Sequence, residues 1–186
     1  MRRTTCQLVW VFAVLGAALA GCAINAEPGK DKAAAAVEGT EVRAADLEKA
    51  IKDQKGKVVL IDCWATWCGP CVKKFPHLVE RHKTYADKGL VCVSVCMEKM
   101  SNPKAYDKDK IVKFLKDKGA TFPNFIVAEP VEDDKALTKL LGDFGLIPYM
   151  ALFDRNGRRV WTSDETPSLA DEELDKKIES LLADKP

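Results

Sequence analysis

The chain has 186 residues, 47% of them hydrophobic, and its formal net charge at pH 7 is +1. This length accommodates one domain and a shorter segment, and the hydrophobic content is sufficient for a packed core, which excludes a disordered chain. The near-neutral charge, without a clustered stripe of Lys and Arg, excludes a nucleic-acid-binding surface. We therefore expect no nucleic acid among the partners.

Residues 1–21 have the pattern of a secretory signal peptide. Arg2 and Arg3 are followed by an apolar run from residue 8 to 19 and then by small residues, and no acidic residue precedes Glu27. The run is shorter than the about 20 apolar residues that span a bilayer. A short buried helix is the alternative, but no polar side chain marks a second face.

The end of this segment reads Leu-Ala-Gly-Cys at 19–22 and resembles the lipobox of bacterial lipoproteins. The resemblance implies that Cys22 becomes the lipid-modified first residue of an exported protein, held at the membrane on the periplasmic side. Several acyl chains make a stable anchor, because each buried CH₂ contributes about 0.8 kcal/mol. Residues 22–39 are polar and low in complexity, which predicts a flexible, lipidated tether.

Residues 40–186 are expected to form one domain of alternating helices and strands. Thr40 is expected to cap a helix that carries Val42, Leu47 and Ile51 on one face. The continuous apolar runs at 58–61 and 90–95 have the pattern of central parallel strands. Further elements are expected as a helix at 70–88, a helix at 109–118, a strand at 122–127, a helix at 133–143, a hairpin of 149–153 with 158–162, and a helix at 171–182. This order predicts an α/β fold in which helices cover both faces of a mixed sheet.

Cys68 and Cys71 stand three residues apart where the first apolar strand gives way to its helix. At the start of a helix this spacing places one sulfur at the exposed tip and the second sulfur one helical turn further along. The two sulfurs are then close enough to form a disulfide. Unpaired N–H groups and the helix dipole stabilise a thiolate there, and lower its pKa from about 8.5 toward roughly 3.5–7.5. The pattern predicts Cys68 as the nucleophile that attacks a disulfide and Cys71 as the thiol that resolves the mixed disulfide.

Two other interpretations of this pair remain. A zinc site needs four ligands, whereas Cys92 and Cys96 lie in a strand and His77 and His82 lie on the following helix. We therefore expect no metal. A purely structural disulfide would close a very short loop, and such a loop constrains little of the unfolded chain.

The chain resembles the thioredoxin superfamily, and among its branches the membrane-anchored TlpA/ResA-like thiol-disulfide oxidoreductases. The resemblance runs from about Gly56 to the C-terminus and rests on the strand ending in Asp62, Trp-Cys-Gly-Pro-Cys at 67–71, Phe-Pro-His-Leu at 75–78, Ile147-Pro148 and Asp-Arg-Asn-Gly at 154–157. It implies a thioredoxin fold and exchange with protein thiols and disulfides. The redox-active disulfide Cys68–Cys71 would then carry the electrons, and no further cofactor is expected.

The resemblance also assigns roles around the cysteines. Asp62, six residues before Cys68 as in thioredoxins, becomes the proton acceptor for Cys71, and its burial would raise its pKa. The alternative for Asp62 is a polar residue at a strand end. The second strand shows no counterpart of the lysine that partners this acid in thioredoxins. Pro148 becomes the cis-proline that faces the cysteines, with Ile147 pairing to an incoming peptide; otherwise Pro148 sets a turn.

The neighbouring residues complete the expected site. Trp67, Gly69 and Pro70 are expected to contact substrate, whereas Trp64 is expected to pack inside. Lys74 stands where ResA-like proteins typically carry a glutamate, so it either favours a thiolate or is a solvated helix residue. This departure argues against assuming the cytochrome c maturation substrate of that branch. His77 and His82 are expected at the surface.

Cys92 and Cys96 are expected in the core. Cys92 and Cys96 lie four residues apart in one strand, roughly 13 Å at a rise of about 3.3 Å per residue, too far to form a disulfide. A link from Cys63 to either of them depends on whether their strands are neighbours. The polar segment 97–110 either shapes partner choice or is a solvated loop.

Reduction is the expected direction, because Gly69-Pro70 between the cysteines and Ile147 before Pro148 resemble reducing members of the superfamily. A reductase outside the cytoplasm needs a membrane-embedded thiol as electron donor. The alternatives are an oxidase or isomerase of the same fold, and a lipoprotein that binds a partner while its disulfide stays idle.

Overall fold

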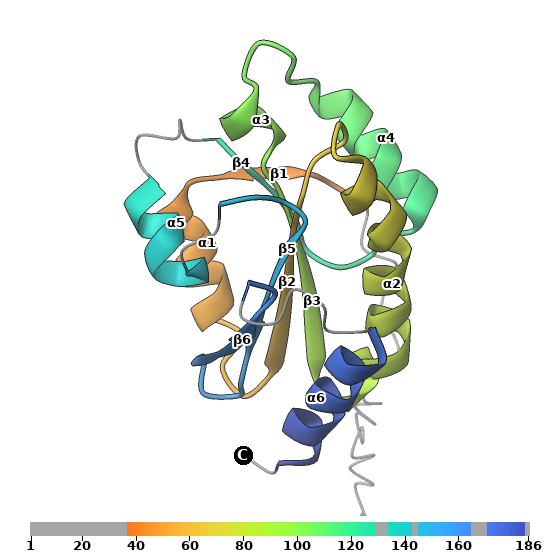
Figure 1. Ribbon diagram of the computed structural model, residues 1–186, viewed down its shortest axis with the longest axis vertical. Helices are drawn as coiled ribbons and strands as arrows, with labels where there is room; N and C mark the ends of the chain where they lie inside the picture. Colours follow the sequence, from red (N-terminus) through yellow and green to blue (C-terminus); the bar gives the residue numbers. More distant parts are fainter. Residues whose placement is uncertain (1–36, 129–133, 143–144, 165–170, 185–186) are drawn as a thin grey trace, which may run out of the picture. The chain divides into compact units, whose positions relative to one another are not determined.

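The computed structural model describes residues 37–128, 134–142, 145–164 and 171–184 (Figure 1). The predicted leader 1–21, the lipidation site Cys22 and the tether up to residue 36 lie outside this part of the chain. Within it, no helix combines the length and the apolar character needed to cross a membrane. Val37 already packs against the core.

Six strands form one mixed sheet in the order β1-β4-β3-β2-β5-β6, as expected for an α/β fold. The first four in this order are parallel neighbours, and the last two run antiparallel at one edge. The strands are β1 (Thr40–Val42), β2 (Val58–Trp64), β3 (Leu90–Cys96), β4 (Asn124–Val127), β5 (Tyr149–Phe153) and β6 (Arg159–Thr162).

Helices cover the two faces of the sheet (Figure 1). On one face lie α1 (Ala44–Lys52) and α5 (Asp134–Leu141). The other face carries α2 (Gly69–Tyr85), α4 (Lys108–Lys118) and α6 (Asp171–Ala183), and α2 runs on into a short 3-10 helix, η1 (Ala86–Lys88). The mixed sheet between two helical layers confirms the predicted architecture.

One predicted element is wrong. Residues 40–42 form β1, which pairs in parallel with residues 125–127 of β4, and the first helix starts only at Ala44. Asp46 accepts a hydrogen bond from the Arg43 backbone N–H at 3.3 Å and so fixes that start. Without β1, the backbone groups along β4 would form an exposed sheet edge, and pairing satisfies them.

The register of β2 and β3 decides where their cysteines lie. Leu60 pairs with Cys92 and Trp64 with Cys96, whereas Cys63 pairs with Val95. Because successive side chains point to opposite faces, Cys63 faces α1 and α5 while Cys92 and Cys96 face α2. All three are free and buried, so the prediction of core packing is confirmed and the conditional Cys63 link is excluded.

Candidate active site

The first turn of α2 holds the two cysteines in a disulfide. Cys68 is the N-cap residue, and its Sγ accepts a hydrogen bond from the Cys71 backbone N–H at 3.2 Å. The Cα atoms of Cys68 and Cys71 are 5.2 Å apart. Gly69 and Pro70 lie exposed between them, at helix positions where proline loses no intrahelical hydrogen bond.

The two sulfur-bearing residues differ in access. Cys68 retains 5% of its surface and Cys71 only 1%, so an incoming disulfide reaches Cys68 first. The N–H groups of the first turn of α2 have no partner within the helix, and they stabilise negative charge at its tip. The geometry therefore favours the predicted order, with Cys68 attacking and Cys71 resolving.

Ile147 and Pro148 lie against the disulfide, although 79 residues separate Ile147 from Cys68 in sequence. The Ile147–Pro148 peptide bond is cis, as the resemblance implied. The Ile147 carbonyl oxygen lies 3.8 Å from Cys68 Sγ. An extended peptide that reached Cys68 would thus lie beside the backbone of Ile147.

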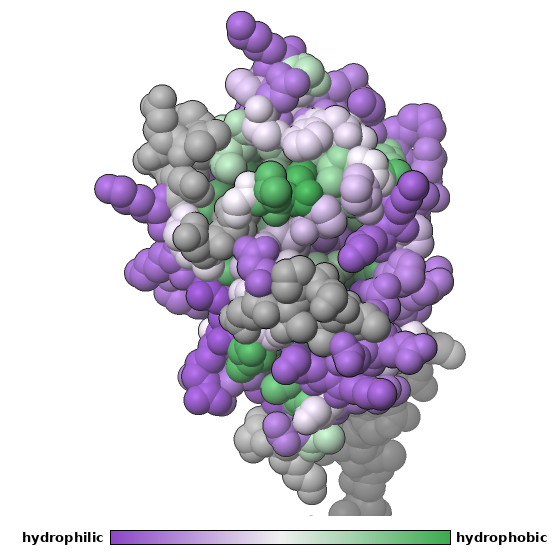
Figure 2. All heavy atoms as spheres, in the orientation of Figure 1, coloured by the Kyte–Doolittle hydropathy of each residue, from purple (hydrophilic) through white to green (hydrophobic). Residues whose placement is uncertain are grey.

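An apolar pocket of about 200 Å³ adjoins the disulfide. Its walls come from Trp67, from the methionines Met97 and Met100, and from the loop 145–147. Trp67 is 54% exposed, as expected for a contact residue, whereas Trp64 is fully buried in packing. Figure 2 shows a largely hydrophilic face with an apolar patch where the chain enters β5.

Asp62 lies inside the protein at the middle of the sheet. It sits in β2 between Leu60 and Trp64, which face α2, and it is 2% exposed. Burial raises the pKa of Asp62 to about 7, while the positive charges of Arg81 and Lys74 act to lower it. The expectation of a raised pKa is confirmed. The charge partner that the second strand lacks is supplied from α2 instead.

A second buried carboxylate was missed by the sequence analysis. Glu98, 2% exposed, accepts a hydrogen bond from the Thr66 backbone N–H at 3.0 Å and so fixes the loop before Cys68. Glu98 is the first residue of the short helix α3 (Glu98–Ser101). This helix lies within the polar segment 97–110, for which both a role in partner choice and a solvated loop were considered. A single acid after a buried strand gave no signal for this contact.

Two further side chains depart from expectation. His82 is half-buried, with its ring centroid 5.3 Å from that of Phe122, so it is no simple surface residue. Arg81 is 3% exposed, although nothing in the sequence analysis singled it out. The spacing of Phe75, Leu78 and Tyr85 already places position 81 on the core side of α2.

Among the described residues no three His, Cys, Asp or Glu side chains form a group that could hold a metal.

Comparison with known proteins identifies the family. The family model described as Redoxin matches residues 30–178. The chain belongs to the Redoxin family. Thiol-disulfide oxidoreductase ResA from Bacillus anthracis is 31% identical over 137 residues, covering 70% of this chain and 70% of the relative. ResA from Geobacillus thermodenitrificans is 29% identical over 178 residues, covering 92% of both chains.

Solved structures with the same fold support this assignment. A thiol:disulfide interchange protein of the thioredoxin family from Chlorobium tepidum superimposes with a TM-score of 0.53 at 22% identity, covering 70% of this chain and 83% of that one. The thioredoxin domain of an oxidoreductase from Bacteroides vulgatus gives 0.52 at 23% identity, covering 70% and 82%. The fold is therefore a thioredoxin fold, and this Redoxin family member is a thiol-disulfide oxidoreductase that carries the Cys68–Cys71 pair.

The raised pKa of Asp62 predicts a pH-dependent cost to stability. In the unfolded chain this carboxyl ionises near 3.8, and in the folded protein near 7. The contribution of Asp62 to stability is therefore most favourable below pH 3.8, and it is lost as the pH rises to 7. We expect Asp62→Asn to increase the free energy of unfolding by roughly 2–4 kcal/mol at pH 8, because each pKa unit corresponds to about 1.4 kcal/mol.

Urea unfolding of the oxidised protein at pH 4 and pH 8 measures this difference. The gain should shrink to well below 1 kcal/mol at pH 4, where Asp62 is protonated in the folded protein and only about half ionised in the unfolded chain. A gain of equal size at both pH values would mean that the ionisation of Asp62 is not its cause.

Proposed function

We propose that the protein is an exported, membrane-anchored reductase of protein disulfides that works through Cys68 and Cys71. The observation that carries this proposal is the position of Cys68, the more exposed cysteine of the pair, at the N-terminus of α2 with the Ile147 backbone and the apolar pocket beside it. The electrons are held by the cysteine pair itself, so the reaction requires no separate cofactor and no metal.

The reaction begins with the reduced pair. The Cys68 thiolate attacks one sulfur of a substrate disulfide, a mixed disulfide forms, and the other substrate sulfur leaves as a thiolate that takes a proton from water. Cys71 then loses its proton and attacks Cys68 Sγ. The Cys68–Cys71 disulfide forms and the second substrate thiolate leaves. Two electrons have passed from the cysteine pair to the substrate disulfide.

Asp62 accepts the proton of Cys71 in this sequence. Both side chains belong to the side of the sheet that α2 covers, and bulk water has little access to Cys71. A base with a pKa of about 7 is partly ionised at neutral pH, which suits general base catalysis. Lys74 is exposed on α2, and its charge favours the ionised form of Asp62.

Substrate contacts surround Cys68. The backbone of Ile147 and Pro148 pairs with an extended segment of the substrate, while Trp67, Gly69 and Pro70 form the exposed surface next to the sulfur. The adjoining pocket is lined mainly by apolar side chains, which favours an apolar residue close to the substrate cysteine. Protein thiols and disulfides in extended segments are therefore the proposed substrates.

The direction of electron flow and the location are finer points of the proposal. Gly69-Pro70 and Ile147 resemble reducing members of the superfamily, and reduction outside the cytoplasm requires a membrane-embedded thiol donor. The leader 1–21 and the lipobox at 19–22 support export and an anchor through Cys22 on the periplasmic side, with 22–39 as tether and 40–186 as the catalytic domain. An oxidase or isomerase would use the same residues at a different redox potential.

Trapping of mixed disulfides tests the catalytic cycle. We expect Cys71→Ser to retain attack by Cys68 and to accumulate covalent adducts with substrate proteins that dithiothreitol releases. Cys68→Ser should reduce turnover with insulin disulfides to the uncatalysed rate. Cys92→Ala, at a buried free cysteine away from the helix tip, is the matched control and should keep turnover. A Cys68→Ser variant that turned over normally would contradict the mechanism and favour the binding lipoprotein.

The reduction potential of the pair tests the direction. Titration of residues 37–186 with thiol buffers, followed by tryptophan fluorescence from Trp64 and Trp67, should give a midpoint below about −250 mV, more reducing than glutathione couples. A midpoint above about −180 mV would make the protein an oxidase or isomerase.

Expression of the full chain in a bacterium that processes lipoproteins tests the anchor. The protein should partition with membranes and gain the mass of its acyl chains at Cys22. Cys22→Ser should abolish the added mass and release the domain into the soluble exported fraction, whereas Cys6→Ser should change neither. Soluble wild-type protein without added mass would contradict lipidation.

A further inference from the structure

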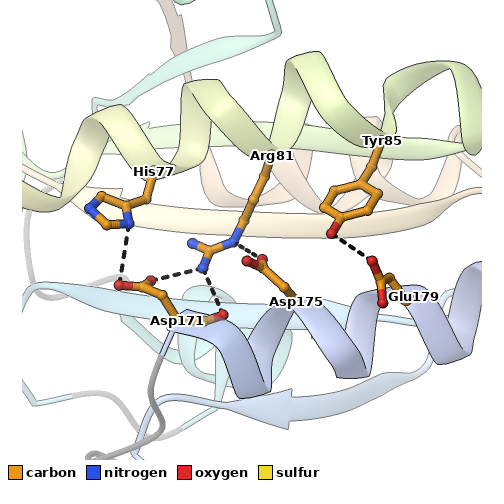
Figure 3. A network of polar contacts seen from close by, with 6 residues as sticks. All are labelled: His77, Arg81, Tyr85, Asp171, Asp175 and Glu179. Carbon is orange, nitrogen blue, oxygen red and sulfur yellow. Dashed lines mark hydrogen bonds and ion pairs between the residues drawn. The ribbon is translucent and has the colours of Figure 1, made fainter.

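Three side chains of α2, His77, Arg81 and Tyr85, make polar contacts with α6 in successive turns (Figure 3). His77 Nδ1 lies 3.3 Å from a carboxylate oxygen of Asp171, and the Tyr85 hydroxyl donates a hydrogen bond of 3.0 Å to Glu179. Between them Arg81 donates to Asp175 at 2.6 Å and to Asp171 at 2.8 Å. The residues recur every four positions on both helices, so one face of each helix carries the contacts.

Arg81 differs from its partners in burial. Its side chain is 3% exposed, whereas the side chains of Asp171 and Asp175 are 44% and 37% exposed. Its Nη1 is buried without a hydrogen-bond partner in the described part of the chain. Water screens the two carboxylates more than it screens the guanidinium, so part of the positive charge inside the protein is left without compensation.

Helix packing alone does not account for this cation. Position 81 lies on the core side of α2 between Leu78 and Tyr85. A well-packed apolar side chain at such a position is often neutral or stabilising relative to a buried ion pair, because desolvation of the charges offsets their attraction. The charge itself therefore calls for a role, and the buried Asp62 and Cys71 lie on the same side of the sheet.

We propose that Arg81 is a positioning residue for the redox reaction: its buried guanidinium, held by the carboxylates of α6, keeps Asp62 able to accept the proton of Cys71. Asp62 and Arg81 lie on the same side of the sheet, each almost fully buried, in the layer between β2 and α2. This inference rests on the proposed function in one respect, the role of Asp62 as proton acceptor.

The charges around Asp62 agree with this role. Burial raises the pKa of Asp62. The positive charges of Arg81 and Lys74, both on α2, lower it, and Arg81 has the larger effect. From β3, Cys92 is a neutral thiol whose pKa burial raises to about 12. Ser94 and Met150, the register partners of Asp62 on β3 and β5, carry no charge. Cys63, next to Asp62 on β2, is kept neutral by burial, which raises its pKa.

The arrangement makes α6 part of the control. Burial works to lower the pKa of Arg81, but its hydrogen bonds with Asp171 and Asp175 outweigh this and raise it. The two carboxylates thus hold the charge in place and also offset part of its field at Asp62. Loss of the cation and loss of its counter-charges should therefore act on Asp62 in opposite directions, which a purely structural contact does not do.

Titration of the Asp62 carboxyl by ¹³C NMR in the oxidised protein tests the electrostatic step. Arg81→Met should shift the midpoint upward by roughly half to one pH unit, since opposite charges near a carboxyl commonly lower its pKa by about one unit or more. Arg81→Lys should shift it less. The Asp171→Asn, Asp175→Asn double variant, altered at partly exposed positions, should shift it downward. Arg158→Met, which removes the exposed Arg158 side chain from its ion pair with Asp154, is the control and should leave the Asp62 midpoint unchanged.

The pH dependence of insulin reduction tests the link to the reaction. For Arg81→Met the ascending limb should move upward with the Asp62 midpoint, lowering the rate at pH 7 by about fivefold for a shift of one unit, with the rate at pH 9 retained. The double variant should move the limb downward. Near-UV circular dichroism verifies that each variant is folded.

Two results would overturn the inference. If the Asp62 midpoint stays in place in every variant, or moves in one direction for Arg81→Met and the double variant alike, Arg81 serves packing only. If the midpoint moves while the rate profile does not, Asp62 is not the proton acceptor that Arg81 assists. The exchange reaction through Cys68 and Cys71 is tested separately, by the trapping of mixed disulfides.

Discussion

The burial of β2 between two helical layers is the constraint on which the site depends. All seven residues of this strand are buried, and it pairs with β3 on one side and β5 on the other. The chain leaves the sheet at the carboxyl end of β2, and α/β folds build their sites at the carboxyl ends of their strands. There it starts α2, so that the redox sulfurs lie at a helix N-terminus fixed by the core.

The same burial gives Asp62 its chemistry. A carboxyl on an exposed strand would ionise near its ordinary pKa, whereas the two packed layers raise the pKa of Asp62 to about 7. The protein then moderates this effect with cations from α2. Its electrostatics thus combine two parts, the N–H groups that stabilise negative charge at the tip of α2 and the charges that act on the buried Asp62.

The similarity to ResA proteins establishes the exchange chemistry, and the thioredoxin-fold structures establish the fold. The α2–α6 contacts of Arg81, the Glu98 anchor of the Thr66 backbone and the methionines of the pocket come from elements outside the cysteine motif. These contacts join the loop before Cys68 to α3 and join α2 to α6.

Sequence patterns determined the features that depend on local order. The continuous apolar runs gave β2 and β3, the cysteine spacing gave the disulfide at the start of α2, and the motif around it gave Asp62, Ile147 and Pro148. The strands and the cysteine pair follow from periodicity and from neighbours in the chain, whereas Asp62, Ile147 and Pro148 were implied by the resemblance to thioredoxins. The alternation of helices and strands likewise gave the mixed sheet.

Only the tertiary structure decided what depends on partners distant in sequence. Residues 40–42 form a strand because the edge of β4 needs a partner, although their pattern favoured a helix. Cys63 stays free because the register turns it away from Cys92, and Arg81 is buried because two carboxylates 90 or more residues later receive it. Strand pairing, register and the partners of a buried charge arise between segments that meet only in the folded chain, so no local pattern could specify them.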